Sequence, residues 1–253
     1  MKTSITENKN IYFLSIIVLL IIWKTASFAY NNEALLPSPE SVIISMINLL
    51  QSADFIKVLC FTLLRGFAGF ILSLIIGSIL GTWAGINLYV EKFLTPLLSV
   101  IKSTPFMSVI LLSLLWLGSE KTPIFAGFLV SFPIIYTNML QGTRSIDKSL
   151  IEMARVYGID RLHILKDIFF PSTAPFLFAG IASAFSIGWK VTVGAEVLSQ
   201  PKYAIGTSLW ESKIFIEVEI LLAWTIYTIL ISSLIEIFIK IIEKKAIRWK
   251  HEI

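Results

Sequence analysis

The hydrophobic residues of the chain lie in six long blocks separated by shorter, more polar segments. The blocks span 11–30, 61–86, 94–117, 123–140, 175–198 and 218–242. Most are near or above the roughly 20 residues that a helix needs to cross a bilayer. They are continuous apolar runs rather than short alternating strands, which excludes a transmembrane β-barrel. Helices remain, because their backbone hydrogen bonds are satisfied internally. The pattern predicts an all-α membrane protein with six transmembrane helices.

The composition supports the same fold class. Of the 253 residues, 56% are hydrophobic and 15% are charged, and the mean hydropathy is +0.81. Soluble domains carry about 25% charged residues, so a soluble globule, a disordered chain and a nucleic-acid-binding domain are excluded. The net charge of +4 is therefore interpreted through membrane topology. With Cys60 as its single cysteine, the chain forms no internal disulfide and no thiolate metal cluster, and we expect no cofactor on it.

The first block allows two interpretations. Its uninterrupted part, 11–23, is short and is followed by Lys24, as in a cleaved signal peptide. We favour a retained anchor helix, because residues 26–30 extend the apolar run and Lys24 can snorkel to the outer interface. The segment 35–56 follows, with Pro39 suited to a first helical position and apolar residues at helical spacing. This spacing predicts an amphipathic helix on the outer membrane surface.

Lysine and arginine residues set the expected orientation. With the N-terminus in the cytoplasm, most of them fall on the cytoplasmic side, as the positive-inside rule requires. Both termini and the long loop 141–174 then face the cytoplasm. The expected organisation is a tail and anchor helix at 1–34, the surface segment 35–56, a transmembrane domain at 57–243 and a basic cytoplasmic tail at 244–253. We interpret the cations of that tail as a stop-transfer and lipid-headgroup cluster. They are Lys244, Lys245, Arg248 and Lys250.

The loop 141–174 carries the pattern of two short amphipathic helices joined at a glycine. Gly158 lies where a left-handed residue closes the first helix. Asp160 is a suitable N-cap for the second helix, which Pro171 would end. With Tyr157 on the apolar face of the first helix, the pattern predicts a docking element for a cytoplasmic protein. The plainer interpretation is a solvated loop whose charges keep it soluble.

The sequence offers little for catalysis. It contains no Gly-x-x-x-x-Gly-Lys-Ser/Thr phosphate loop, no Gly-x-Ser-x-Gly elbow and no histidine–carboxylate metal cluster, which are the usual signatures of nucleotide, nucleophile and metal sites. We therefore expect no enzyme activity and no ATP bound to this chain, so the energy for any transport would come from another subunit.

Lys190, near the middle of the fifth block, is the main candidate for contact with a solute. A lysine at the centre of a membrane helix costs on the order of 2.5–3.5 kcal/mol, so it should face protein or a wet cavity. We expect Lys190, with the neighbouring Trp189 and with Glu196, to line a pathway that attracts an anionic solute. The alternative is an internal salt bridge from this lysine to one of three carboxylates: Glu196, Glu211 or Glu236.

Several other residues receive structural interpretations. Arg65, near the start of the second block, is interpreted as an interfacial cation whose side chain snorkels. Glycines of the same block, several of them four residues apart, favour close helix packing. Pro105 and Pro133 should kink the third and fourth helices.

One string in the long loop resembles the EAA loop of the membrane subunits of bacterial binding-protein-dependent ABC importers. It reads Glu152-Met153-Ala154-Arg155-Val156-Tyr157-Gly158, followed by Phe169-Phe170-Pro171. Met153 departs from the family form, which begins Glu-Ala-Ala. Further strings resemble the nitrate/taurine/aliphatic-sulfonate branch: Leu36-Pro37-Ser38-Pro39, Ile101-Lys102-Ser103-Thr104-Pro105, Leu115-Trp116-Leu117-Gly118, Phe132-Pro133-Ile134 and Ala195-Glu196-Val197. Lys102 stands where the family usually has arginine, which keeps the charge. The resemblance covers about 35–249.

The resemblance implies a type I ABC importer permease, with a core of five helices plus an N-terminal helix, in the bacterial cytoplasmic (inner) membrane. It implies that two such subunits, as a homodimer, form the pathway, that two ATPase subunits grip the EAA loops, and that an extracytoplasmic solute-binding protein supplies the solute. Carried over to this chain, the expected ATPase-coupling residues are Glu152, Ala154, Tyr157, Gly158 and Pro171.

The function expected from these features is import of a small anionic solute of the sulfonate, nitrate or taurine type. The same branch also handles pyrimidine vitamin precursors, so a thiamine-precursor type of solute is an alternative. A scaffold or sensor that binds a cytoplasmic partner without transport is an alternative of another class. An ion-coupled secondary transporter would predict carboxylates within the spans, whereas the second, third and fourth blocks have none between their ends.

Overall fold

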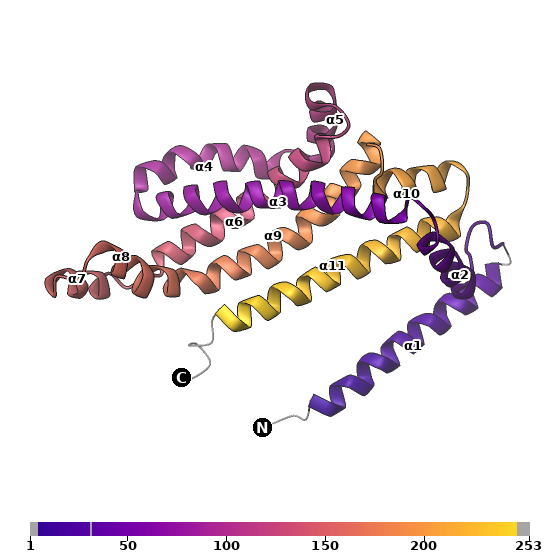
Figure 1. Cartoon of the computed structure of the whole chain (residues 1–253), viewed down its shortest axis with the longest axis horizontal. Helices are drawn as coiled ribbons and strands as arrows, with labels where there is room; N and C mark the ends of the chain where they lie inside the picture. Colours follow the sequence, from indigo (N-terminus) through magenta and orange to yellow (C-terminus); the bar gives the residue numbers. More distant parts are fainter. Residues whose placement is uncertain (1–4, 31, 247–253) are drawn as a thin grey trace. The chain divides into compact units, whose positions relative to one another are not determined.

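The computed structural model describes residues 5–30 and 32–246, with the side chains of 5–10 and 12 excepted. The predicted tail cations Arg248 and Lys250 lie outside these described residues. In chain order the elements are α1 (Ile5–Tyr30), α2 (Pro39–Leu50), α3 (Phe55–Ile86), α4 (Leu88–Ser103), α5 (Phe106–Leu117), α6 (Thr122–Arg144), α7 (Lys148–Val156), α8 (Arg161–His163), the π-helix η1 (Ile164–Phe169), α9 (Phe170–Ser199), α10 (Ile205–Ile214) and α11 (Val218–Ala246) (Figure 1).

Five continuous helices in the described residues have the length and hydropathy of membrane spans. They are Phe13–Tyr30 of α1, then α3, α6, the helix that runs from α8 through α9, and α11, while α4 and α5 together count as a sixth, broken span. The all-α membrane fold class is confirmed. The helix α3 begins at Phe55, six residues before the block predicted from the sequence, and α11 continues to Ala246.

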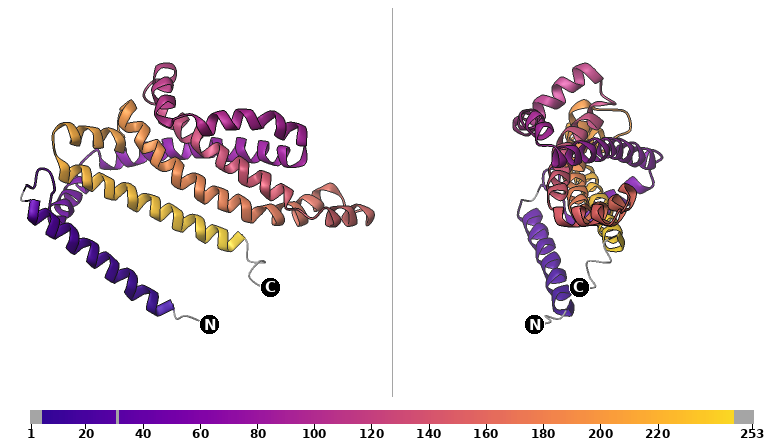
Figure 2. Two further views of the ribbon diagram at one scale, coloured as in Figure 1. Left: turned by 180° about the vertical axis from the view of Figure 1, so that it is seen from behind. Right: turned by 90° about the vertical axis from the view of Figure 1, so that its left-hand side faces the viewer.

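The third block, predicted as one span kinked at Pro105, consists of two separate helices. α4 and α5 meet at an angle of 97°, and Figures 1 and 2 show α5 standing steeply away from α4. Thr104 at the break is extended, with φ −73° and ψ 127°. Pro105 explains this conformation, because proline disfavours helical geometry in the residue before it and has no N–H to continue the ladder. By contrast, α6 runs through Pro133 as one element.

The chain divides into two compact units, 57–207 with 229–253 and 1–56 with 208–228. In the larger unit α6 packs antiparallel against α9, and α3 packs parallel to α6. A side chain added at Gly127 would meet Thr192, one at Gly142 would meet Phe176, and one at Gly69 would meet the backbone of α6. These close approaches confirm that small residues serve helix packing. The helices α7 and α8 lie together at one end of this unit (Figure 2), which we call the loop end.

The smaller unit contains α2, whose first residue is Pro39 as predicted, with Ser38 as its N-cap. Val42 is fully buried, and the Tyr227 hydroxyl donates a 2.8 Å hydrogen bond to the carbonyl of Met46. Ahead of α2, Lys24 pairs with Glu40 at 2.5 Å. That hydrogen bond lowers the pKa of the Glu40 carboxyl below its usual value.

Replacing Gly69 by alanine is expected to lower the free energy of unfolding by about 1–3 kcal/mol, the usual cost of forcing atoms into a packed core. The new Cβ would lie 2.5 Å from the backbone oxygen of Ile124, which has no room to move. Gly194→Ala is the matched control, because nothing lies within 4 Å of its Cβ position. That change should be neutral or stabilising by up to about 1 kcal/mol, since alanine favours helices. Thermal unfolding of the purified variants measures both, and equal effects would contradict the packing assignment.

Candidate functional site

The helix α7 is closed at both ends by local hydrogen bonds. Asp147 is its N-cap and accepts the N–H of Ser149 at 2.8 Å, and the hydrogen bonds from Ser149 lower the pKa of the Asp147 carboxyl. At the other end Gly158 has φ +69°. Its N–H donates to the carbonyl of Arg155 at 3.0 Å, and the next N–H, of Ile159, donates to Ala154 at 2.9 Å. This paired arrangement is a Schellman closure, so the predicted left-handed role of Gly158 is confirmed.

Most apolar residues of α7 have no cover within the described chain. Ala154 is turned inward and only 1% exposed, whereas Val156 is 86% exposed and Tyr157 78%. Leu150 and Met153 are also exposed, and Glu152 lies among them. Apolar residues gathered on a surface at the end of a connecting loop usually mark an interaction site. We call these exposed residues, Leu150, Glu152, Met153, Val156 and Tyr157, the α7 surface.

The second loop helix differs from the prediction. Asp160 takes the N-cap position, but its carboxylate pairs with the His163 ring, and this hydrogen bond lowers the pKa of Asp160. α8 passes through η1 directly into α9, so Pro171 does not end a helix and instead lies near the start of α9. Proline is tolerated there because the register changes at the π-helix and the first turn of α9 needs fewer backbone donors.

A groove of ≈ 830 Å³ lies beside the α7 surface. Ile86, the last residue of α3, forms one wall, and Ile159 with Ile164 adds further apolar lining. Arg155 and Arg161 supply positive charge at the same groove, and Asp160 supplies one carboxylate. The loop end therefore combines an exposed apolar helix with a basic hollow, which suits a protein partner.

The three candidate pathway residues of α9 differ in their surroundings. Trp189 is 2% exposed and stacks on Phe185 with 6.3 Å between ring centroids. A side chain at Gly66 of α3 would approach the Trp189 ring to 3.1 Å, so this ring belongs to the packing between α3 and α9. Lys190 is exposed, and it forms no ion pair with any residue in the described part of the chain. Of the three, Lys190 is the residue placed to meet something outside this chain.

Glu196 is fully buried in a network of hydrogen bonds near the end of α9. Its carboxylate pairs with the Arg65 guanidinium at 3.1 Å and accepts the Thr62 hydroxyl at 3.0 Å. The N–H of Gly206 donates to the same carboxylate at 3.2 Å. A charge in such a dry place requires this set of partners. The contacts with Arg65 and Thr62 tie α9 to α3.

Arg65 is not a snorkelling interfacial cation, which corrects the sequence interpretation. Its side chain is buried, pairs with Glu120 at 2.6 Å in addition to Glu196, and donates to the carbonyls of Lys202 and Tyr203. Glu120 in turn accepts the N–H of Lys202 at 3.0 Å. Sequence reasoning missed the pairing, although two opposite charges, each inside an apolar block, were the signal that it exists.

Comparison with known proteins identifies the family of the chain. The model of the family described as "Binding-protein-dependent transport system inner membrane component" matches residues 73–248. SsuC of Bacillus subtilis (strain 168), a permease protein named for aliphatic sulfonates transport, is 25% identical over 236 residues, which cover 92% of this chain and 85% of SsuC. The nitrate import permease protein NrtB of Leptolyngbya laminosa is 27% identical over 152 residues, 60% of this chain and 54% of NrtB.

An inward facing structure of the MetNI methionine ABC transporter matches with a TM-score of 0.64 and 14% identity, covering 78% of this chain and 99% of that one. The last match shows a shared fold.

Proposed function

Since the chain belongs to the family of binding-protein-dependent transport system inner membrane components, we propose that it forms the pathway of an ABC importer for a small anionic solute. In this proposal a separate ATPase subunit holds the α7 surface and drives transport. Two copies of the chain would form the pathway in the cytoplasmic membrane, and an extracytoplasmic binding protein would supply the solute.

The observation that carries the proposal is the exposed apolar face of α7. Val156 and Tyr157 stand in solvent on a helix that is held rigid by Asp147 and by the turn at Gly158. The charged residues Lys148, Glu152 and Arg155 are exposed as well, so the exposed apolar residues are what a merely solvated loop does not explain. An apolar face of this kind is stabilised when it enters a groove of another protein. Glu152 and Ala154, named from the EAA resemblance, lie on this same helix, and the Ala154 side chain is buried.

The connection from α7 to the spans supports coupling by rigid movement. α8, η1 and α9 together form one helical stretch of 39 residues, Arg161–Ser199. A displacement of the loop end would therefore be passed along α9, which carries Lys190, to the network at Glu196. Closure of an ATPase dimer would in this way change the access of the pathway from one side to the other. Pro171 lies at the join of η1 and α9, where the helical register changes.

The charge of the pathway supports an anionic solute. Lys190 is exposed within a span and has no ion pair among residues 5–30 and 32–246. Its cost in the membrane is reduced if it faces an aqueous pathway. The relatives named for aliphatic sulfonates and for nitrate take anions, and an uncompensated lysine would attract that class of solute.

Lys190→Met is expected to lower the rate of anion import about tenfold, the size of effect that loss of one charge-assisted contact produces. ATP hydrolysis should continue, because the change is far along α9 from the loop end. Lys92→Met, at an exposed lysine of α4, is the matched control and should import normally. Import of radiolabelled solute into proteoliposomes is the measurement. Unchanged import by Lys190→Met would remove this residue from the pathway.

The proposed function is tested by reconstitution. The chain would be purified with the ATPase and binding protein encoded beside it, and the binding protein screened by thermal shift against nitrate, taurine and short alkyl sulfonates. We expect one anion to stabilise the binding protein and to be accumulated with ATP. A cysteine placed at Glu152, in a Cys60→Ser background, should react only from the ATPase side. Reaction from the opposite side would overturn both the orientation and the coupling.

A further inference from the structure

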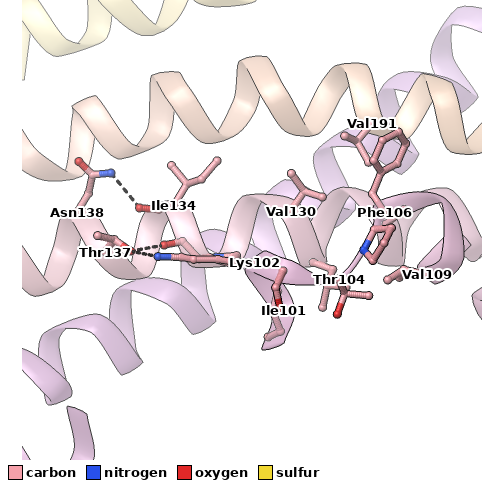
Figure 3. A pocket seen from close by; sticks show the side chains of 15 residues that line it. Ile101, Lys102, Thr104, Phe106, Val109, Val130, Ile134, Thr137, Asn138 and Val191 are labelled. Atoms are coloured by element: carbon pink, nitrogen blue, oxygen red, sulfur yellow. Dashed lines mark hydrogen bonds between the residues drawn. The ribbon is translucent and has the colours of Figure 1, made fainter. Parts of the chain in front are cut away.

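A cavity of ≈ 750 Å³ lies at the break between α4 and α5. Its walls come from the broken pair, from α6 and from α9, as Figure 3 shows with Ile101, Val109, Val130 and Val191. This volume lies in the range of small-molecule sites, and a mostly apolar wall with a few convergent polar groups is their usual composition.

Lys102 is the charged residue among those that line the cavity. Its ammonium group lies 3.3 Å from the Thr137 hydroxyl oxygen, and that hydroxyl donates to the carbonyl of Pro133 at 2.7 Å. Figure 3 shows the lysine side chain extended along α6 toward Thr137. Within the described part of the chain Lys102 forms no ion pair. Its charge is therefore not compensated by any described carboxylate.

Lys102 lies near the end of α4, the first helix of the broken span. It is the fifteenth of the 16 residues of α4, Leu88–Ser103, so it lies about 20 Å along the helix from Leu88 at 1.5 Å per residue. A cation within a membrane span normally faces a wet cavity or a partner charge, and Lys102 lines the cavity.

The polar groups of the cavity favour a ligand that accepts hydrogen bonds. The lysine has three N–H donors, and one is directed at Thr137. α5 begins at the cavity with no side-chain cap on its first turn, which leaves backbone donors there as well. The lining includes no carboxylate. The apolar walls, the ammonium group and the remaining N–H donors together fit an oxyanion that is small or carries a short alkyl group.

We propose that this cavity is a binding site for one small oxyanion, such as nitrate or an alkyl sulfonate, and that Lys102 supplies its charge. The proposal rests on the transport function above and adds a site distinct from Lys190. The bend at Thr104 creates the site, because it turns α5 away and leaves the end of α4 open toward α6 and α9.

The first test measures charge at the cavity without transport. Val130→Cys, in a Cys60→Ser background, would be modified in nanodiscs by an anionic and by a cationic methanethiosulfonate of similar size. The ratio of the two rates cancels changes in thiol reactivity. We expect the anionic reagent to react about tenfold faster, as expected for attraction by a partly shielded cation. Lys102→Met should abolish the preference and Lys102→Arg should keep it.

Two controls complete this test. Leu97→Cys lies on an exposed part of α4 outside the cavity and should show no preference between the reagents. Nitrate or methanesulfonate should slow the anionic reagent at Val130→Cys more than chloride does at equal ionic strength. An equal rate for both reagents, or a preference that survives Lys102→Met, would overturn the site.

The second test compares import by the reconstituted complex. Lys102→Met should lower import of nitrate or alkyl sulfonate about tenfold, while Lys92→Met should import normally. If the unaltered complex imports these anions and Lys102→Met imports them equally well, the site is wrong and the proposed function stands. If the unaltered complex imports none of them, the proposed solute class is wrong, and the labelling ratio still decides whether the cavity attracts anions.

Discussion

Gly158→Val is expected to abolish solute import, because it removes the bend that sets the direction of α7. Gly158 has φ +69°, with nothing within 4 Å of its Cβ position, so the effect arises from the backbone and not from a clash. A left-handed conformation costs an L-residue roughly 1–2 kcal/mol, and a β-branched one more. The chain would relieve this strain by losing the hydrogen bonds to Arg155 and Ala154, and the α7 surface would lose its fixed presentation.

The chain provides a matched control for this prediction in Gly118. This glycine ends α5 with φ +76° and also has nothing within 4 Å of its Cβ position, but it lies away from the loop end. Because its ψ is 174°, in a region that essentially only glycine occupies, Gly118→Val should suffer at least as much local strain and still import at a measurable rate. Import and co-purification of the ATPase would be measured for both variants. If the two lost import equally, the loss would reflect general damage and not coupling through α7.

Arg65→Met is expected to lower the free energy of unfolding by about 3–5 kcal/mol, the usual cost of leaving one member of a buried ion pair without its partner. Glu196 would be left without its cationic partner at a site with 0% exposure, supported by Thr62 and Gly206 alone. The bond to Glu120 contributes less, because that carboxylate is largely exposed. Thermal unfolding of the purified chain measures the effect.

The double variant Arg65→Met/Glu196→Gln separates a charge effect from a packing effect. Because it removes both charges, it should recover much of the lost stability. Glu40→Gln, at the exposed pair with Lys24, is the control and should not change stability measurably. If the double variant were as unstable as Arg65→Met, the network would act through packing rather than through charge.

The features that the sequence predicted well are those with local causes. The number and type of spans follow from the length of each apolar run, since a helix in lipid needs only its own backbone partners. The start of α2 at Pro39 and the left-handed conformation of Gly158 could also be predicted, because each follows from the backbone preference of one residue.

The shape of the third block could not be predicted from local sequence features. Thr104 and Pro105 marked the place of a distortion, yet a proline in an apolar run is compatible with a slight kink, as well as with the observed bend of 97°. The choice depends on contacts elsewhere. Leu94 and Leu98 of α4 bury against Phe132 of α6, while Ile110 of α5 buries beside Ala126 and Ala195. The two helices thus bury against different residues of α6 and α9, and the break allows both contacts.

The candidate site divides in the same way. The sequence predicted an amphipathic helix at α7 and a role for Lys190, because amphipathic spacing and a charge in an apolar run are visible along the chain. It placed Ala154 on the apolar docking face, whereas the structure buries Ala154 and exposes Val156. The pairing of Arg65 with Glu196 joins residues 131 positions apart, and the cavity at Lys102 joins α4, α6 and α9. Neither feature leaves a periodic pattern in the sequence, because each depends on which helices pack against one another.

By itself, then, the sequence determined that this chain crosses a membrane as helices and presents an amphipathic, glycine-closed loop, because hydrophobic length and backbone preference belong to individual segments. The tertiary structure alone decided which charges are neutralised and which remain open. It buried Arg65 against Glu196 and left Lys102 and Lys190 without carboxylate partners among the described residues. The physical reason is that a charge in a span is defined by its neighbours in space, and helix packing brings those neighbours from distant parts of the chain.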